Sequence, residues 1–112
     1  MAIEVQGETI ETDANGNLLN PQDWSRDVAK KLAAEEDIEL TQDHWDVLEY
    51  LRDEYLNNNG NHPMERQINK DMGKHWGKKI GSKDLYKLFP RAPSKQGNKI
   101  AGLPFVARKG GY

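Results

Sequence analysis

The segment from Thr41 to Asn61 constrains the fold most, because its apolar residues recur at helical spacing. Steps of three and four residues separate them: Trp45, Leu48, Leu51 and Tyr55. This spacing is typical of one face of an amphipathic α-helix. Thr41 is a suitable N-cap, and the asparagine-rich run with Gly60 tolerates the left-handed backbone that ends helices. A helix with one apolar face has to pack against other elements, so we expect a helical core.

Two further apolar stripes predict the partners of this helix. After Asn20-Pro21, which suits a helix start, the first stripe runs to about Glu36 through Trp24, Val28, Leu32 and Ala33. After His62-Pro63 comes a second stripe of Met64, Ile68, Met72 and Trp76. Ser82 is the expected cap of a short helix that Pro90 stops, with Leu85, Tyr86, Leu88 and Phe89. We expect residues 92–99 to form one more short helical turn. We expect three stripes to meet in one core: Trp24/Val28/Leu32, Trp45/Leu48/Leu51/Tyr55 and Ile68/Met72/Trp76.

The first residues predict a small β-hairpin instead of a helix. Apolar and polar residues alternate in residues 2–5 and 8–11, and Gln6-Gly7 suits a two-residue turn. The predicted fold class is therefore mainly α (α+β): a helical bundle with an N-terminal hairpin, a helix-turn-helix-like pair at 64–89 and an extended C-terminal arm. We expect one domain over residues 1–102, with residues 103–112 as the arm of the same domain.

Charge is divided unevenly along the chain. Residues 1–60 hold fifteen acidic and four basic residues, a net charge of −11, while residues 61–112 sum to +9. A basic face concentrates anionic ligands, although the two halves could instead neutralise each other within one fold. The candidate contacts to anions or nucleic acid are Lys70, Lys74, Lys78, Lys79, Arg91, Lys95 and Lys99.

The residue types restrict the chemistry. The chain has no cysteine, which excludes disulfides, thiolate metal sites and thiol nucleophiles and fits a reducing cytoplasm. Its three histidines, His44, His62 and His75, lack the spacing of a zinc site. We therefore predict no metal, no cofactor and no catalytic residue, and expect His44 to be a surface or capping residue. Apolar runs are too short for a membrane span, so we predict a cytoplasmic protein without a membrane partner.

Three blocks of sequence together resemble the DsrC/TusE family of sulfur-relay proteins. The blocks are ETDANGNLLNPQDWS at 11–25, TQDHWDVLEYLRDEYL at 41–56 and KDLYKLFPRAPSKQGNKIAGLP at 83–104. The resemblance covers essentially the whole chain. It implies the family's fold and a C-terminal arm whose penultimate cysteine carries sulfur as a persulfide.

This chain departs from the family at its sulfur-carrying positions. The resemblance places a second cysteine of the DsrC branch at Asn98 and the arm cysteine at Gly111, or at Lys109 by an ungapped count. None of these side chains can form a persulfide, because that chemistry needs a thiolate. The sequence therefore predicts that the chain is not an enzyme.

Two functions follow from the sequence. The first is a non-catalytic regulatory or docking protein whose partner is a TusBCD/DsrEFH-type sulfurtransferase or a dissimilatory sulfite reductase. Its arm would bind through Ile100, Leu103, Phe105, Arg108, Lys109 and Tyr112. The alternative is a DNA-binding transcriptional regulator that uses the basic helix-turn-helix-like half.

Overall fold

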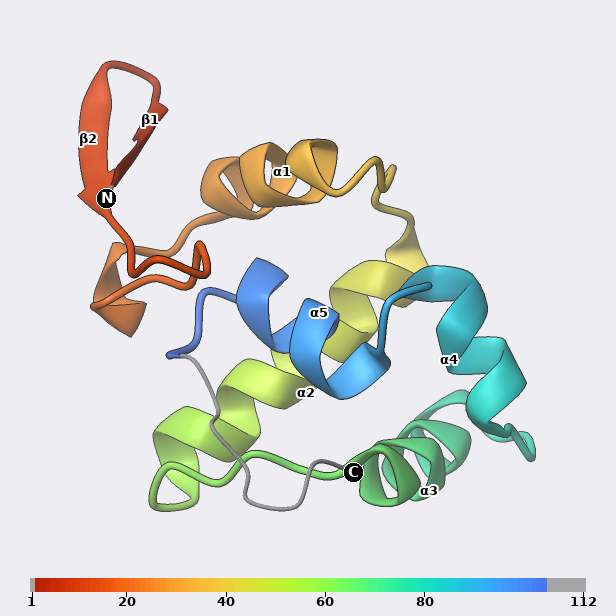
Figure 1. Cartoon of the computed structure of the whole chain (residues 1–112). Coiled ribbons are helices and arrows are strands. Elements are labelled where there is room, and N and C mark those ends of the chain that lie inside the picture. The colour runs from red at the N-terminus through yellow and green to blue at the C-terminus, as the bar shows by residue number, and fades with distance from the viewer. Residues whose placement is uncertain (1, 105–112) are drawn as a thin grey trace.

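The computed structural model describes residues 2–104, which form a two-stranded sheet, a short 3-10 helix and five α-helices (Figure 1). In chain order the elements are β1 (Ala2–Val5), β2 (Glu8–Glu11), η1 (Pro21–Asp23), α1 (Arg26–Glu35), α2 (Gln42–Asn57), α3 (Glu65–Trp76), α4 (Ser82–Leu88) and α5 (Pro93–Ile100). The predicted fold class, mainly α with an N-terminal hairpin, is confirmed. None of the described helices is long and apolar enough to cross a membrane.

The hairpin has the predicted two-residue turn. Strands β1 and β2 pair antiparallel, with Ile3 opposite Ile10. Gln6 and Gly7 both have positive φ, 50° and 82°, as the turn that matches the twist of paired strands requires. Ile10 is buried, so this side of the hairpin packs against the helical part of the molecule.

The predicted helix from Asn20 to Glu36 is wrong in one respect, because it is broken at Trp24. Asn20 caps only the 3-10 turn η1, and Trp24 is extended, with φ −75° and ψ 145°. Ser25 then caps α1, since its side chain accepts a hydrogen bond from Val28 N. The break turns the Trp24 side chain toward the C-terminal segment, where its indole N–H donates to Ile100 O at 2.9 Å.

Helix α5 is the centre of the molecule, although the sequence predicted only a short turn there. It contacts each of the other four α-helices, and Figure 1 shows it in the middle of the bundle. A Cβ at Gly97 would lie 3.1 Å from Leu51 Cδ1, so glycine lets α5 pack closely on α2. The core around it joins residues of every helix except η1, including Leu32, Leu48, Ile68, Leu85 and Ile100.

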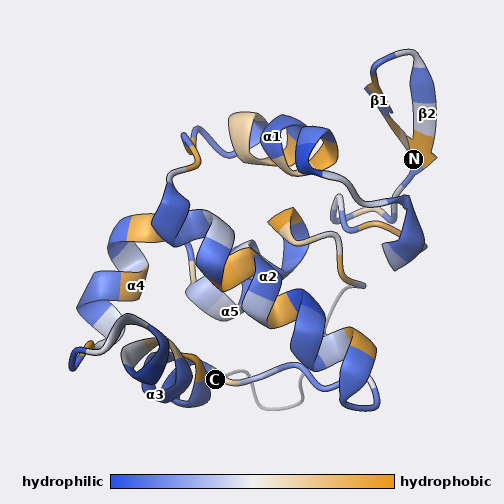
Figure 2. Ribbon diagram, turned by 180° about the vertical axis from the view of Figure 1, so that it is seen from behind, coloured by the Kyte–Doolittle hydropathy of each residue, from blue (hydrophilic) through white to orange (hydrophobic). Residues whose placement is uncertain are grey.

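The three predicted stripes do meet in this core, with their ends less buried than expected. Figure 2 shows α2 as alternating hydrophobic and hydrophilic bands. Trp24, Tyr55 and Trp76 are only partly buried. Met64 is 48% exposed and precedes α3 as its N-cap, so the buried part of this stripe begins at Ile68.

Polar side chains connect α3 to α2. Trp76 Nε1 donates to Asp46 Oδ2 at 2.8 Å, and Tyr50 donates to Asp71. Partial burial alone would raise the pKa of Asp71, but hydrogen bonds from Tyr50 and Gln67 and the nearby lysines of α3 hold it below its ordinary value. Trp76 therefore spans the boundary of the core, with its ring packed and its N–H paired.

His44 is buried in the first turn of α2, and both of its ring nitrogens have partners. The backbone N–H of Thr41 donates to Nδ1 at 3.0 Å, and Nε2 lies 2.8 Å from Leu88 O. This pairing requires a neutral ring with its proton on Nε2. The capping role is confirmed, but the surface position is wrong. Burial lowers the pKa of His44, outweighing the Leu88 carbonyl and the Asp43 charge, which favour protonation.

We expect acidification to destabilise the protein through His44. The unfolded chain takes up this proton near pH 6.5, before the folded chain does, so stability is present above that pH and falls as pH drops toward the lower folded pKa. Urea unfolding at about pH 7.5 and about pH 5.5 should show a smaller loss in His44→Gln than in the unaltered chain. His75→Gln, a change at an exposed histidine, is the control. Equal losses in the unaltered chain and in His44→Gln would contradict this assignment.

Candidate functional site

Residues 100–104 are packed into the core and held from distant parts of the chain. Ile100, Ala101 and Leu103 are fully buried. Three long-range hydrogen bonds end on carbonyl oxygens of this segment: Trp24 Nε1 to Ile100 O (2.9 Å), Arg52 Nη1 to Ala101 O (2.9 Å) and Asn17 Nδ2 to Leu103 O (3.2 Å). Buried hydrogen bonds of this kind fix the backbone. They set the point at which the chain leaves the core, at Pro104.

The prediction that Ile100 and Leu103 contact a partner is therefore wrong for this structure. Both side chains are 0% exposed and belong to the core. A division between a domain at 1–102 and an arm at 103–112 would cut this core at Leu103. The other predicted arm residues lie outside the described residues and stay predictions: Phe105, Arg108, Lys109 and Tyr112, together with Gly111.

Asn98, at the position where the resemblance implies a second cysteine, is 2% exposed. Its Nδ2 lies 3.0 Å from His62 Nδ1 and 3.3 Å from Pro104 O. The amide thus joins α5 to the segment before α3 and to the end of the described chain. Here Asn98 has a structural role that needs no thiol.

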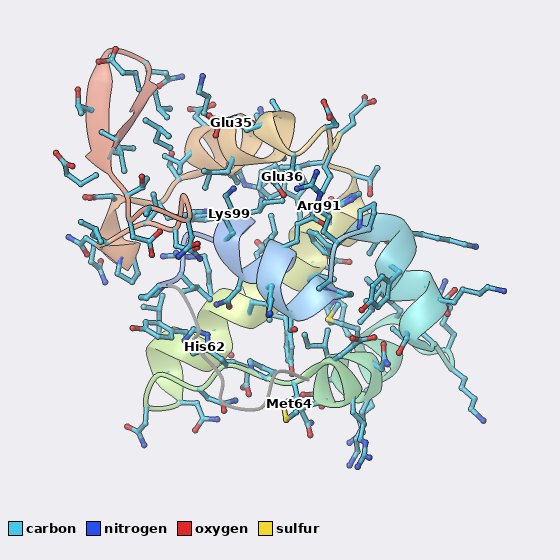
Figure 3. All side chains as sticks on the ribbon, in the orientation of Figure 1. Glu35, Glu36, His62, Met64, Arg91 and Lys99 are labelled. Carbon is cyan, nitrogen blue, oxygen red and sulfur yellow. The ribbon has the colours of Figure 1, made fainter. Side chains whose placement is uncertain are left out.

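A groove opens beside this junction, between the segment before α3 and the segment that joins α4 to α5. We call it the His62 groove; its volume is about 1110 Å³, and its walls include His62, Met64, Arg66, Tyr86, Arg91 and Lys95. Met64 and Tyr86 are 48% and 40% exposed, which is high for large apolar side chains. Figure 3 shows His62 and Met64 on the same segment, ahead of α3. Sequence reasoning missed His62 as a groove residue, because its position depends on a contact with Asn98 across 36 residues.

The predicted basic residues Arg91, Lys95 and Lys99 line a smaller pocket above α5, together with Glu36. Lys99 Nζ lies 3.2 Å from Glu36 Oε2, and both side chains are largely buried. Burial alone would raise the pKa of Glu36, but the hydrogen bonds from Gln96 and Lys99 and the charges of Lys99 and Arg91 lower it. Figure 3 shows Glu36, Arg91 and Lys99 on one side of the molecule. Lys99 is thus engaged within the fold and is a poor candidate for binding an external anion.

The other four predicted basic residues lie elsewhere, along α3 and the loop after it. With Arg66 they line an open concavity of about 660 Å³, which we call the basic groove: Arg66, Lys70, Lys74, Lys78 and Lys79. The structure therefore separates the seven predicted cations into two places. Only the lysines of the basic groove form a surface of one charge.

Within residues 2–104, no group of three histidine, cysteine, aspartate or glutamate residues could hold a metal ion. The His62 groove offers apolar and aromatic surface, and the basic groove offers positive charge. Within the His62 groove, the Tyr86 hydroxyl donates to Glu65 Oε2 at 3.3 Å.

Comparison with known proteins agrees with this fold. Residues 4–106 match the family model described as DsrC like protein. The sulfurtransferase TusE of Photorhabdus laumondii subsp. laumondii is 44% identical over 100 residues, 88% of this chain and 89% of that protein. The NMR structure of Allochromatium vinosum DsrC is 40% identical, with a TM-score of 0.88 and coverage of 97% of this chain and 99% of that one.

A second solved structure extends the likeness. The oxidized gamma-subunit of the dissimilatory sulfite reductase (DsrC) from Archaeoglobus fulgidus is 32% identical, with a TM-score of 0.89 and coverage of 97% and 99%. The fold, in which residues 100–104 are held in the core, is that of a DsrC-like helical protein. The chain belongs to the DsrC/TusE family, and its role lies in sulfur relay.

These comparisons correct the prediction that the chain is not an enzyme. The relatives at 44–45% identity are named sulfurtransferases, so the missing thiol was too narrow a ground for that prediction. The names of the matched proteins support neither a regulatory role nor DNA binding. The helices of the predicted helix-turn-helix pair exist as α3 and α4, but many helical proteins contain such a pair.

Proposed function

We propose that this chain takes part in a sulfur relay by binding a protein partner at the His62 groove. The partner is a sulfurtransferase of the TusBCD/DsrEFH type or a dissimilatory sulfite reductase. One observation carries the proposal: Asn98 joins Pro104 to His62, so the chain leaves the core beside the groove. Residues that follow Pro104 can then contact the same partner that fills the groove.

The composition of the groove suits a protein partner. Exposed apolar side chains at Met64 and Tyr86 offer area to bury, and Arg66 and Arg91 flank them. Tyrosine, methionine and arginine are enriched at protein interfaces, where a few such anchors supply most of the binding energy. The groove also holds Glu54 and Glu65, so the flanking charge is mixed.

Binding would rest on non-covalent contacts from this side of the complex. The 112 residues contain no cysteine, so no mixed disulfide or shared persulfide can join this chain to a partner thiol. The affinity should therefore be the same with and without a thiol reductant, provided the partner itself is unaffected.

The test is calorimetry with a purified TusBCD-type complex. We expect Met64→Ala/Tyr86→Ala to bind about tenfold or more weakly, because two anchors of about 1 kcal/mol or more are removed. Leu19→Ala, at a leucine that is 60% exposed but does not line the groove, is the matched control. A 1–104 chain tests the residues beyond Pro104 and keeps the buried Leu103, which a 1–102 chain would lose.

Two results would reject the proposal. Equal affinity for the unaltered chain, the groove variant and the 1–104 chain would show that neither element contacts the partner. Equal losses in the groove variant and in Leu19→Ala would show a general effect of lost apolar surface. Circular dichroism of each variant checks that the fold is intact.

A further inference from the structure

The basic groove is formed by one regular stripe of cations on α3 and by the loop that follows the helix. Arg66, Lys70 and Lys74 lie four residues apart, so they share one face of α3. At a rise of about 1.5 Å per residue, they are spaced about 6 Å apart along the helix axis. All of them are exposed.

The loop after α3 adds two more cations to the same surface. Gly77 ends the helix with a left-handed φ of 67°, and Lys78 N then donates to Gly73 O at 3.0 Å. A Cβ at Gly73 would lie 2.9 Å from Lys78 O, so glycine is needed for the loop to lie this close. This reversal places Lys78 and Lys79 along the groove with Lys70 and Lys74.

The positive charge of the groove is only partly offset within the described part of the chain, where Lys70 and Lys74 help to lower the pKa of nearby Asp71. No aspartate or glutamate lines it. The ion pairs found among residues 2–104 involve Arg26, His75 and Lys99, and none of the five groove cations. Lys78 Nζ lies 5.9 Å from the centre of the Trp76 ring, but none of the five cations has a carboxylate of the described chain in ion-pair contact. These like charges repel one another, so a bound acidic group would relieve an existing cost.

We infer that the basic groove is a docking surface for an acidic helix of a protein partner. Glutamates at every fourth position of such a helix are also about 6 Å apart, which matches the spacing of Arg66, Lys70 and Lys74. The groove joins the His62 groove at Arg66, which lines both. The inference nevertheless stands apart from the proposed function, since it needs only an acidic helix.

The geometry favours an acidic helix over a nucleic acid. A duplex carries about one charge per 1.7 Å along its whole length. The stripe from Arg66 to Lys74 is only about 12 Å long, in a molecule whose longest extent is 41 Å. Figure 1 places the hairpin, which carries Glu4, Glu8 and Glu11, at the opposite end from α3, where a long anion would be repelled. No tyrosine, phenylalanine or tryptophan lines the groove to stack on bases.

Fluorescence anisotropy at about 0.15 M salt tests the inference with three labelled probes. The first is a helical peptide with glutamates at every fourth position, the second has the same composition with the glutamates spread around the helix, and the third is a short DNA duplex. The variant is Lys70→Gln/Lys74→Gln. Its matched control, Lys30→Gln/Lys31→Gln, removes the same charge from exposed lysines of α1.

We expect the unaltered chain to bind the one-faced peptide more tightly than either other probe. The groove variant should bind that peptide about tenfold more weakly, and the α1 control should lose less than about twofold. Met64→Ala/Tyr86→Ala should bind the one-faced peptide with the same affinity as the unaltered chain. This result separates the inference from the proposed function. Equal binding of the two peptides, equal losses in the two lysine variants, or tighter binding of the duplex would overturn it.

Discussion

Gly102→Ala should destabilise the protein by about 2–5 kcal/mol, because the change adds two costs at one position. Gly102 has a φ of +72°, which costs a residue with a Cβ about 1–2 kcal/mol. Its Cβ would also lie 2.2 Å from Trp24 Cδ1, and overpacking of a core typically costs about 1–3 kcal/mol more. Urea unfolding followed by circular dichroism measures the difference.

Gly77→Ala separates the two costs. Gly77 has a similar φ of +67°, but nothing lies within 4 Å of the Cβ that alanine would add. We expect about 1–2 kcal/mol for this control, from backbone strain alone. If both variants lost the same stability, the close packing of Gly102 on Trp24 would not be an important restraint.

Leu48→Ala is the second change with a large expected effect. Leu48 is 0% exposed in the middle of α2, and truncating such a leucine typically costs about 2–5 kcal/mol through lost burial and the cavity left behind. Leu51→Ala should cost as much, since Leu51 lies against Gly97 of α5. Thermal or urea unfolding gives the values.

Leu56→Ala is the control on the same helix. Leu56 is 44% exposed, so its loss should change the free energy of unfolding by about 0.5 kcal/mol or less. A cost near zero at Leu48 and Leu51 would show that α2 does not supply the core. It would also contradict the view that α5, packed on α2, helps to hold residues 100–104 in place.

The large effects expected at Gly102 and Leu48 connect stability to the proposed binding. Trp24, Arg52 and Asn17 hold the carbonyl oxygens of residues 100–103, and α5 rests on α2 beneath them. The chain therefore leaves the core at a fixed point, Pro104, beside which the proposed partner binds. Fixing the backbone in advance lowers the ordering cost that binding would otherwise carry.

The sequence was sufficient for the elements whose signals are local. The Gln6-Gly7 turn, the cap at Thr41 and the apolar stripe of α2 depend on neighbours a few residues away, and all three are present in the structure. Local backbone preference and helical spacing determine such features. The family could also be predicted, because its motifs run through the chain.

Tertiary structure decided the features that depend on distant contacts. Trp24 leaves the predicted helix to reach Ile100, and α5 becomes the central helix although it is short and buries the polar Gln96 and Asn98. The buried face of α5 includes Gln96, Gly97 and Asn98, so no apolar stripe marks this helix in the sequence. Likewise, lysines that look alike in the sequence differ in the fold: Lys99 pairs with Glu36, while Lys70 and Lys74 line the basic groove.

The candidate site also combines features that follow from the sequence with features that follow only from folding. The sequence by itself determined that the chain lacks cysteine and that its second half is basic, since these are matters of composition. Only the folded chain places Ile100 and Leu103 in the core and His62 beside Asn98, because burial and pairing across tens of residues follow from packing. The His62 groove exists for that reason, as a space between residues 54–67 and residues 86–95, whereas the basic groove is formed locally by α3 and the loop after it.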